Sequence, residues 1–189
     1  MPGQPSVRIP DAAHLGETGG EVRAEQGKPL LLVDVDGVIS LWGFDLDDRP
    51  DGGYHTVDGI PHFLSQEAGR HLLTLSRAFE LVWCTGWEER ANEHLPGLLG
   101  LPGPLPYLSF DRHLAAGTST PGHWKLGAID AYAGERPVAW IDDAFNDACH
   151  AWAGDRPAPT LLVRTEPATG LVAEHAGLLL AWAEAARDR

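Results

Sequence analysis

The apolar and polar positions of this chain alternate between strand-like and helix-like stretches. Apolar residues dominate residues 30–36, 79–84, 107–110, 137–141 and 160–163. Apolar runs of this length are typical of strands that are buried on both faces of a sheet. Because helical stretches separate most of them, the pattern predicts an α/β fold with a parallel sheet.

Helical spacing appears first behind Ser65, which is a favourable N-cap residue. Ala68, Leu72, Leu75 and Phe79 follow at positions i, i+4, i+7 and i+11, so we predict a helix laid against the sheet. Four further helices are predicted: over 87–95 with a stop at Pro96-Gly97, over 124–133, over 145–153, and over 171–186 with Leu178, Trp182 and Ala185 on one face.

The stretch 41–63 is loop-like and holds four aspartates before a β-prone piece, 54–57, that is followed by Asp58-Gly59. An Asp-Gly pair beside a β-prone run predicts a hairpin or flap. The aspartates do not form a calcium loop, because Arg49 and Pro50 stand where a ligand and the turn glycine are required.

The length of 189 residues suits one domain with a substantial core. Residues 1–27 are rich in Gly, Pro, Glu and Gln, so we expect a flexible segment there and a single α/β domain over 28–189. We also expect no signal peptide and no membrane partner. Cys84 and Cys149 lie far apart in apolar sequence, which favours core packing in a reducing cytoplasm.

The formal net charge of −13 repels nucleic-acid backbones and anionic membranes. No basic patch offsets this charge, because lysine occurs only at Lys28 and Lys125 and the arginines are scattered. Nucleic acid is therefore not the expected partner. A site in which acidic residues hold a divalent cation suits such a chain.

Polar groups follow three of the predicted strands. In an open parallel sheet the carboxyl ends of the strands form the ligand site, so these groups converge although they are distant in sequence. Clustered carboxylates repel one another unless a cation neutralises them, and hard oxygen ligands indicate Mg²⁺. The hydroxyl group of Thr85 and the ammonium group of Lys125 are suited to bind a phosphoryl group. The strand-end residues are Asp34 and Asp36, then Thr85, then Asp142 and Asp143.

These residues stand in the order of the four motifs of the haloacid dehalogenase (HAD) superfamily, at 31–37, 81–86, Lys125 and 140–143. The chain resembles in particular the small bacterial HAD domains that also occur in multidomain RNA-repair proteins. The resemblance implies a three-layer Rossmann-like parallel sheet with helices on both faces. It also implies a minimal or absent cap domain, because 41–63 and 101–123 are short for a folded cap.

The resemblance also assigns roles. It implies a Mg²⁺-dependent phosphomonoester hydrolase in which Asp34 attacks phosphorus and forms an aspartyl-phosphate. Asp36 would protonate the leaving alkoxide and later accept a proton from the hydrolytic water. The carboxylate at Asp36 favours a phosphatase over a dehalogenase, which lacks one at that position. The expected partner is a small phosphorylated substrate.

The binding roles follow in the same way. Thr85, the amide of Gly86 and Lys125 would hold phosphate oxygens. Trp42 and Trp87 border the motifs and are candidates for substrate contact or for walls of the pocket. Asp34, the backbone carbonyl of Asp36 and Asp143 would coordinate Mg²⁺, and Asp142 would either share that task or orient Lys125.

Two alternatives stay open: a catalytically idle HAD-like binding or scaffold protein, and a phosphatase that acts on nucleic-acid ends. A phospho-acceptor signalling module is disfavoured by motif order, because such modules place the acceptor aspartate on a later central strand. Zinc is disfavoured as well, since none of the nine histidines shows the paired helical spacing of metalloprotease ligands.

Overall fold

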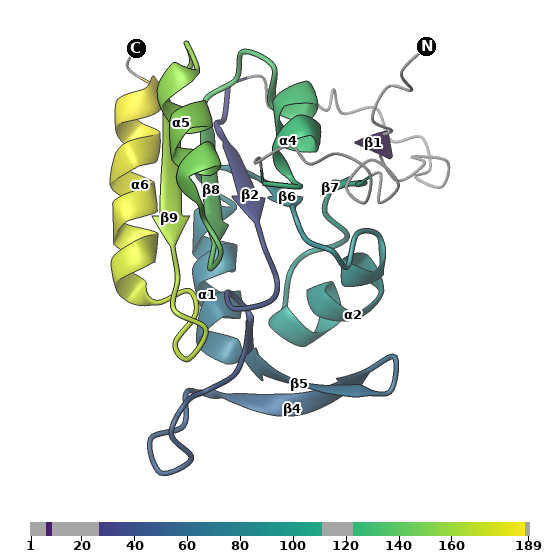
Figure 1. Cartoon of the computed structure of the whole chain (residues 1–189). Helices are drawn as coiled ribbons and strands as arrows, with labels where there is room; N and C mark the ends of the chain where they lie inside the picture. Colours follow the sequence, from purple (N-terminus) through teal and green to yellow (C-terminus); the bar gives the residue numbers. More distant parts are fainter. Residues whose placement is uncertain (1–6, 9–26, 111–122, 188–189) are drawn as a thin grey trace, which may run out of the picture.

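The computed structural model describes residues 7–8, 27–110 and 123–187. Its centre is a six-stranded sheet in the order β1-β7-β6-β2-β8-β9 (Figure 1). The five strands from β7 to β9 are parallel, and only the short edge strand β1 runs antiparallel to its neighbour β7. The strands are β1 (Val7–Arg8), β2 (Leu30–Val33), β6 (Glu80–Trp83), β7 (Tyr107–Leu108), β8 (Val138–Asp142) and β9 (Thr160–Arg164).

Helices cover both faces of this sheet, which confirms the predicted three-layer α/β fold. They are α1 (Gln66–Leu75), α2 (Arg90–Leu99), α4 (Leu126–Ala133), α5 (Asp147–Asp155) and α6 (Ala173–Arg187). Side chains alternate across a strand, so Leu31 and Val33 pack with α1, α2 and α6, whereas Leu30 and Leu32 pack with α4 and α5. Figure 1 shows α4 and α5 nearer the viewer than α1.

A second, small sheet has the order β3-β5-β4 and consists of β3 (Ser40–Leu41), β4 (Gly52–Val57) and β5 (Ile60–Ser65). Asp58 and Gly59 join β4 to β5 with φ angles of 51° and 81°, as a tight hairpin turn requires. The hairpin prediction is therefore confirmed, and the stretch 41–63 that was expected to be loop-like carries the strands β4 and β5 over much of its length. Figure 1 places this sheet beyond the carboxyl end of β2, where a minimal cap is expected.

Two helix predictions need correction. Helix α2 does not stop at Pro96 but continues to Leu99 and ends at Gly100, whose φ is 69°. Leu95 and Leu99 are buried in the core, and this packing offsets the hydrogen bond that Pro96 cannot donate. Helix α1 ends at Leu75, before Phe79, because the chain turns there into β6.

The buried face of α6 also differs from the predicted one. Ala176, Leu179 and Ala183 face the core, whereas Leu178 is 51% exposed. The helix is rich in apolar residues all round, so periodicity alone did not select the face that packs. Trp182 lies at the edge of this contact and stacks on Phe79, with 6.2 Å between the ring centroids.

Two predictions concern residues outside the described ones. The flexible segment at 1–27 is described only at Val7, Arg8 and Gly27, where Val7 pairs with Leu108. The loop predicted at 101–123 is described to residue 110 and again at residue 123.

Candidate active site

The site lies where β2 and β8 run side by side. The strand order proceeds from β2 through β6 to β7 in one direction and through β8 to β9 in the other, so β2 and β8 flank the point at which the order reverses. Ligands of open α/β sheets bind at the carboxyl ends of such strands. Asp34 directly follows β2 and Asp142 is the last residue of β8. The backbone N–H of Asp34 donates to the carbonyl of Ile141 over 3.1 Å, which fixes the two strand ends together.

Lys125 joins these two aspartates. Its Nζ lies 2.9 Å from Oδ2 of Asp34 and 2.6 Å from Oδ2 of Asp142. All three side chains are almost fully buried. Lys125 is the N-cap residue of α4, where its charge opposes the helix dipole. The negative charges of Asp34 and Asp142 offset this unfavourable interaction of Lys125 with the helix dipole.

Burial and charge act in opposite directions on this cluster. Burial raises the pKa of Asp34 to about 7, although the Lys125 ammonium and the Val35 N–H both favour the carboxylate. Burial alone would lower the pKa of Lys125, but the neighbouring Asp34 and Asp142 raise it above its ordinary value. Lys125 therefore stays protonated, and Asp34 is the group of this pair that gains or loses a proton near pH 7.

Asp142 and Asp143 have different surroundings. Asp142 Oδ2 accepts from Lys125 and, over 3.1 Å, from the indole of Trp140, while its Oδ1 accepts from the N–H of Ala144 over 2.9 Å. Asp143 is only partly buried, and burial and the charge of Asp142 raise its pKa. Asp142 is thus held by protein groups on both oxygens, and Asp143 is the more accessible carboxylate.

Three carboxylates meet closely enough to hold a cation. Asp34, Asp142 and Asp143 each offer one oxygen, and these oxygens lie within 4.8 Å of one another. The backbone at Gly37 makes room for this cluster, because a Cβ atom there would lie 2.6 Å from the Asp143 carboxylate. Hard oxygen donors around a small space are suited to a divalent cation.

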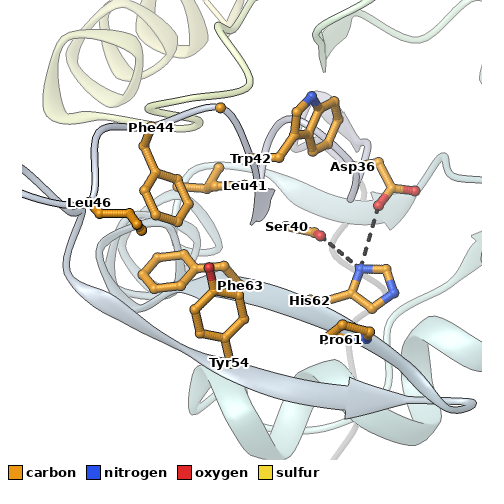
Figure 2. Close-up of a pocket in the computed structure, with 11 residues that line it drawn as sticks. Asp36, Ser40, Leu41, Trp42, Phe44, Leu46, Tyr54, Pro61, His62 and Phe63 are labelled. Atoms are coloured by element: carbon orange, nitrogen blue, oxygen red, sulfur yellow. Dashed lines mark hydrogen bonds and ion pairs between the residues drawn. The ribbon is translucent and has the colours of Figure 1, made fainter.

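Asp36 points away from that cluster. Its Oδ2 accepts from the indole N–H of Trp87 over 3.0 Å, and its Oδ1 lies 4.0 Å from Nδ1 of His62. The side chain of Asp36 is 48% exposed. The hydroxyl oxygen of Ser40 lies 2.9 Å from the same His62 nitrogen (Figure 2). Residues of β3 and β5 therefore both lie near Asp36.

Thr85 and Gly86 follow β6, the other neighbour of β2. Thr85 is fully buried, and its hydroxyl accepts from the N–H of Trp87 over 3.3 Å. A Cβ atom on Gly86 would lie 3.9 Å from the ring of Trp124. Trp124 is 49% exposed and its ring lies 5.2 Å from Nζ of Lys125, which makes it a further aromatic wall of the site.

Comparison with protein families agrees with this geometry. Residues 30–176 match the family model described as the HAD domain in Swiss Army Knife RNA repair proteins. The chain belongs to this HAD family. No curated protein matches the chain. Among the described residues of this HAD domain, no helix combines the length and the apolar character needed to cross a membrane.

A pocket opens beside Asp36 between the small sheet and the segment that follows β3 (Figure 2). Its volume is about 380 Å³. Trp42 lines the pocket of the HAD domain and is 47% exposed, whereas Trp87 is buried and its indole is bound to Asp36. The wall is formed by Asp36, Ser40, Leu41, Trp42, Gly43, Phe44, Leu46, Tyr54, Pro61, His62 and Phe63.

Sequence reasoning missed His62, Tyr54 and Phe63 in this pocket. The Asp58-Gly59 turn predicted the hairpin that carries them. Which of its side chains line the pocket beside Asp36 depends on how the hairpin packs on the HAD domain. No local signal in the sequence carries that information.

Proposed function

We propose that this HAD domain is a Mg²⁺-dependent phosphomonoester hydrolase that acts through an aspartyl-phosphate on Asp34. The observation that carries the proposal is the buried contact of Asp34 with Lys125 beside Asp142 and Asp143. A carboxylate is a weak nucleophile, so a site of this kind must accelerate the reaction mainly through charge and orientation.

Asp34 is oriented for attack by two contacts. Its Oδ1 accepts from the N–H of Val35 over 2.8 Å, and its Oδ2 lies beside Lys125. In the first step a carboxylate oxygen of Asp34 bonds to phosphorus and the ester P–O bond breaks. In the second step water attacks the same phosphorus, the bond to Asp34 breaks, and inorganic phosphate leaves.

Asp36 moves the protons in both steps. Its protonated carboxyl gives a proton to the leaving alkoxide, and the resulting carboxylate accepts a proton from the attacking water. The indole of Trp87 holds one oxygen of Asp36, and the partial exposure of the side chain allows exchange with solvent. Such acid–base catalysis contributes about 10²- to 10⁴-fold to a rate.

The remaining polar groups bind the phosphoryl group and the metal. Thr85, the amide of Gly86 and Lys125 hold phosphate oxygens, and Asp142 orients Lys125 through their contact of 2.6 Å. Asp34, Asp143 and the backbone carbonyl of Asp36 would hold Mg²⁺. When bound, the metal neutralises the carboxylates and the charge that develops on the phosphoryl oxygens.

A second candidate is a phosphatase of nucleic-acid ends, which the words "RNA repair" in the family description favour. The net charge of −13 opposes it, because a polyanion is repelled before it reaches the site. We therefore propose a small phosphorylated substrate. The third alternative, an idle scaffold, gains no support from the site, since every polar group that the reaction needs is present.

Release of phosphate from p-nitrophenyl phosphate tests the proposal. Wild-type protein should release phosphate only with Mg²⁺, Asp34→Asn should be inactive, and Asp155→Asn, at an exposed carboxylate on α5, should behave as wild type. Wild-type protein that is inactive on a broad panel of phosphomonoesters, with and without Mg²⁺, would favour the scaffold.

A further inference from the structure

The pocket beside Asp36 has two chemically different ends. Figure 2 shows Asp36, Ser40 and His62 together at one end and Phe44, Tyr54 and Phe63 at the other. Rings meet closely at the aromatic end: the Phe44 and Phe63 centroids are 4.6 Å apart, and those of Tyr54 and Phe63 are 5.2 Å apart. The pocket thus passes from hydrogen-bonding groups at Asp36 to aromatic surface away from it.

Much of this aromatic surface is accessible. Tyr54 is 61% exposed and Trp42 is 47% exposed, whereas Phe63 is buried and contacts the Tyr54 ring edge-on. Large exposed apolar side chains beside a site usually mark the position of a ligand. Rings with a free face bind planar groups by stacking.

The position of Asp36 determines which part of a substrate occupies the pocket. As the proton donor to the leaving alkoxide, Asp36 must lie within hydrogen-bond reach of the ester oxygen. Asp36 also lines the pocket, so a group attached to that oxygen extends into it. The pocket is therefore a leaving-group site and not a second phosphate site.

Charge around the pocket limits the kind of leaving group. Asp45, Asp47 and Asp48 are exposed on the segment between β3 and β4, and Arg49 is the basic residue among them. The Arg49 guanidinium lies 6.0 Å from the Phe63 ring centroid. An acidic rim repels further phosphates, so the best occupant is a ring without negative charge.

We propose that this pocket binds a planar aromatic leaving group, so that the substrates are small phosphomonoesters in which a short polar linker joins an aromatic ring to the phosphate. The ring stacks on Tyr54 and Trp42, and the linker contacts Ser40 and His62. A nucleoside monophosphate has this arrangement, with a polar sugar between phosphate and base. This inference rests on the proposed phosphatase function.

A matched pair of substrates tests the inference. Adenosine 5′-monophosphate and ribose 5-phosphate share the ester bond and the sugar but differ in the base. Wild-type protein should have about 5- to 150-fold higher kcat/KM for the nucleotide, which is the range that stacking of one base on an aromatic side chain gives. Equal values for the two substrates would overturn the inference.

Three variants refine the test. Tyr54→Ala and Trp42→Ala should each lower kcat/KM for the nucleotide much more than kcat/KM for ribose 5-phosphate, so that most of the preference is lost. Ile60→Ala is the control, because Ile60 is 59% exposed on the same hairpin and is not part of the pocket wall. An equal fall for both substrates in Tyr54→Ala would mean that the ring is only structural, and the inference would fail.

Binding of adenosine, measured by calorimetry, separates this inference from the proposed function. If no phosphomonoester is hydrolysed but adenosine binds to wild-type protein and about tenfold more weakly to Tyr54→Ala, the phosphatase proposal fails and the ring site stands. A 5′-phosphorylated oligoribonucleotide completes the panel. Hydrolysis comparable with that of the mononucleotide would overturn the restriction to small substrates, and much slower hydrolysis would support it.

Discussion

The ammonium group of Lys125 lies 2.9 Å from the carboxylate of Asp34 and 2.6 Å from that of Asp142. One buried cation therefore holds two carboxylates that come from neighbouring strands. Its removal leaves both charges without compensation, and the protein must protonate them, bind a cation or lose stability.

Lys125→Met should destabilise the metal-free protein by about 3–5 kcal/mol, because it leaves buried carboxylates unpaired. Urea unfolding without Mg²⁺ measures the loss, and added Mg²⁺ should restore part of it. The control Arg77→Met changes an exposed cation and should stay within about 0.5 kcal/mol of wild type. Equal losses in the two variants would show that the Lys125 contacts add nothing to stability.

The two aspartates of the first motif should differ in function. Asp34→Asn should abolish turnover and weaken Mg²⁺ binding, because it removes the nucleophile and a metal ligand. Asp36→Asn should slow turnover by about 10²- to 10⁴-fold, as expected for the loss of an acid–base group. Its Mg²⁺ affinity should stay near that of wild type, since the proposed contact is through the backbone. Calorimetry with Mg²⁺ and phosphate release measure both, and an equal loss of affinity would contradict the assignment.

The affinity for Mg²⁺ should depend on pH. Burial raises the pKa of Asp34 to about 7 in the metal-free protein, and the pKa of Asp143 is raised as well. Below that pH a proton must leave before the metal binds, so the affinity should fall by about tenfold per pH unit as the pH decreases from 7. Calorimetry between about pH 5.5 and 8.5 checks this, and a constant affinity would contradict it.

The raised pKa of Asp34 also determines whether the metal-free protein becomes more or less stable as the pH rises. Between the ordinary carboxyl pKa of 3.8 and about 7, the folded metal-free protein binds a proton at Asp34 that the unfolded chain has released. This contribution to stability is complete below the lower value and is lost as the pH rises through the upper one. Asp34→Asn should flatten this part of the pH profile of urea unfolding.

Gly37→Ala should disrupt the acidic cluster. A Cβ atom at Gly37 would lie 2.6 Å from the carboxylate of Asp143, and the φ of 74° is unfavourable for alanine. Gly59→Ala is a matched control, because Gly59 has a φ of 81° but no atom within 4 Å of the added Cβ. Both variants should lose stability, but only Gly37→Ala should lose Mg²⁺ affinity. Retained affinity in Gly37→Ala would show that Asp143 does not need its present position.

Trp87→Phe should slow turnover without changing the fold. The substitution keeps a buried ring but removes the N–H that donates to Asp36 over 3.0 Å. We expect kcat to fall by about tenfold and KM to change little, because the indole positions the acid and does not bind the substrate. Trp152→Phe removes a similar indole contact, to Asp130 instead of Asp36, and should have no effect on turnover. A selective rise in KM would instead make Trp87 a substrate contact.

Much of the fold could be predicted from the sequence because its signals are local. The apolar runs predicted the central strands, and the residues that follow them, such as Asp34 and Thr85, were placed at the strand ends. The hairpin was predicted for a similar reason, since Asp58 and Gly59 accept the positive φ angles that a tight turn needs. These features depend on backbone conformation and on burial within a few residues.

The sequence by itself determined which groups end the strands and therefore the chemistry that the site offers. Only the tertiary structure decided which of them touch: the lysine lies between Asp34 and Asp142, and Trp87 and His62 lie against Asp36. Lys125 is 17 positions from Asp142 and 91 positions from Asp34 in the sequence, and Trp87 is 51 positions from Asp36. Such contacts follow from strand order and from the packing of the hairpin on the domain, which no local pattern of residues encodes.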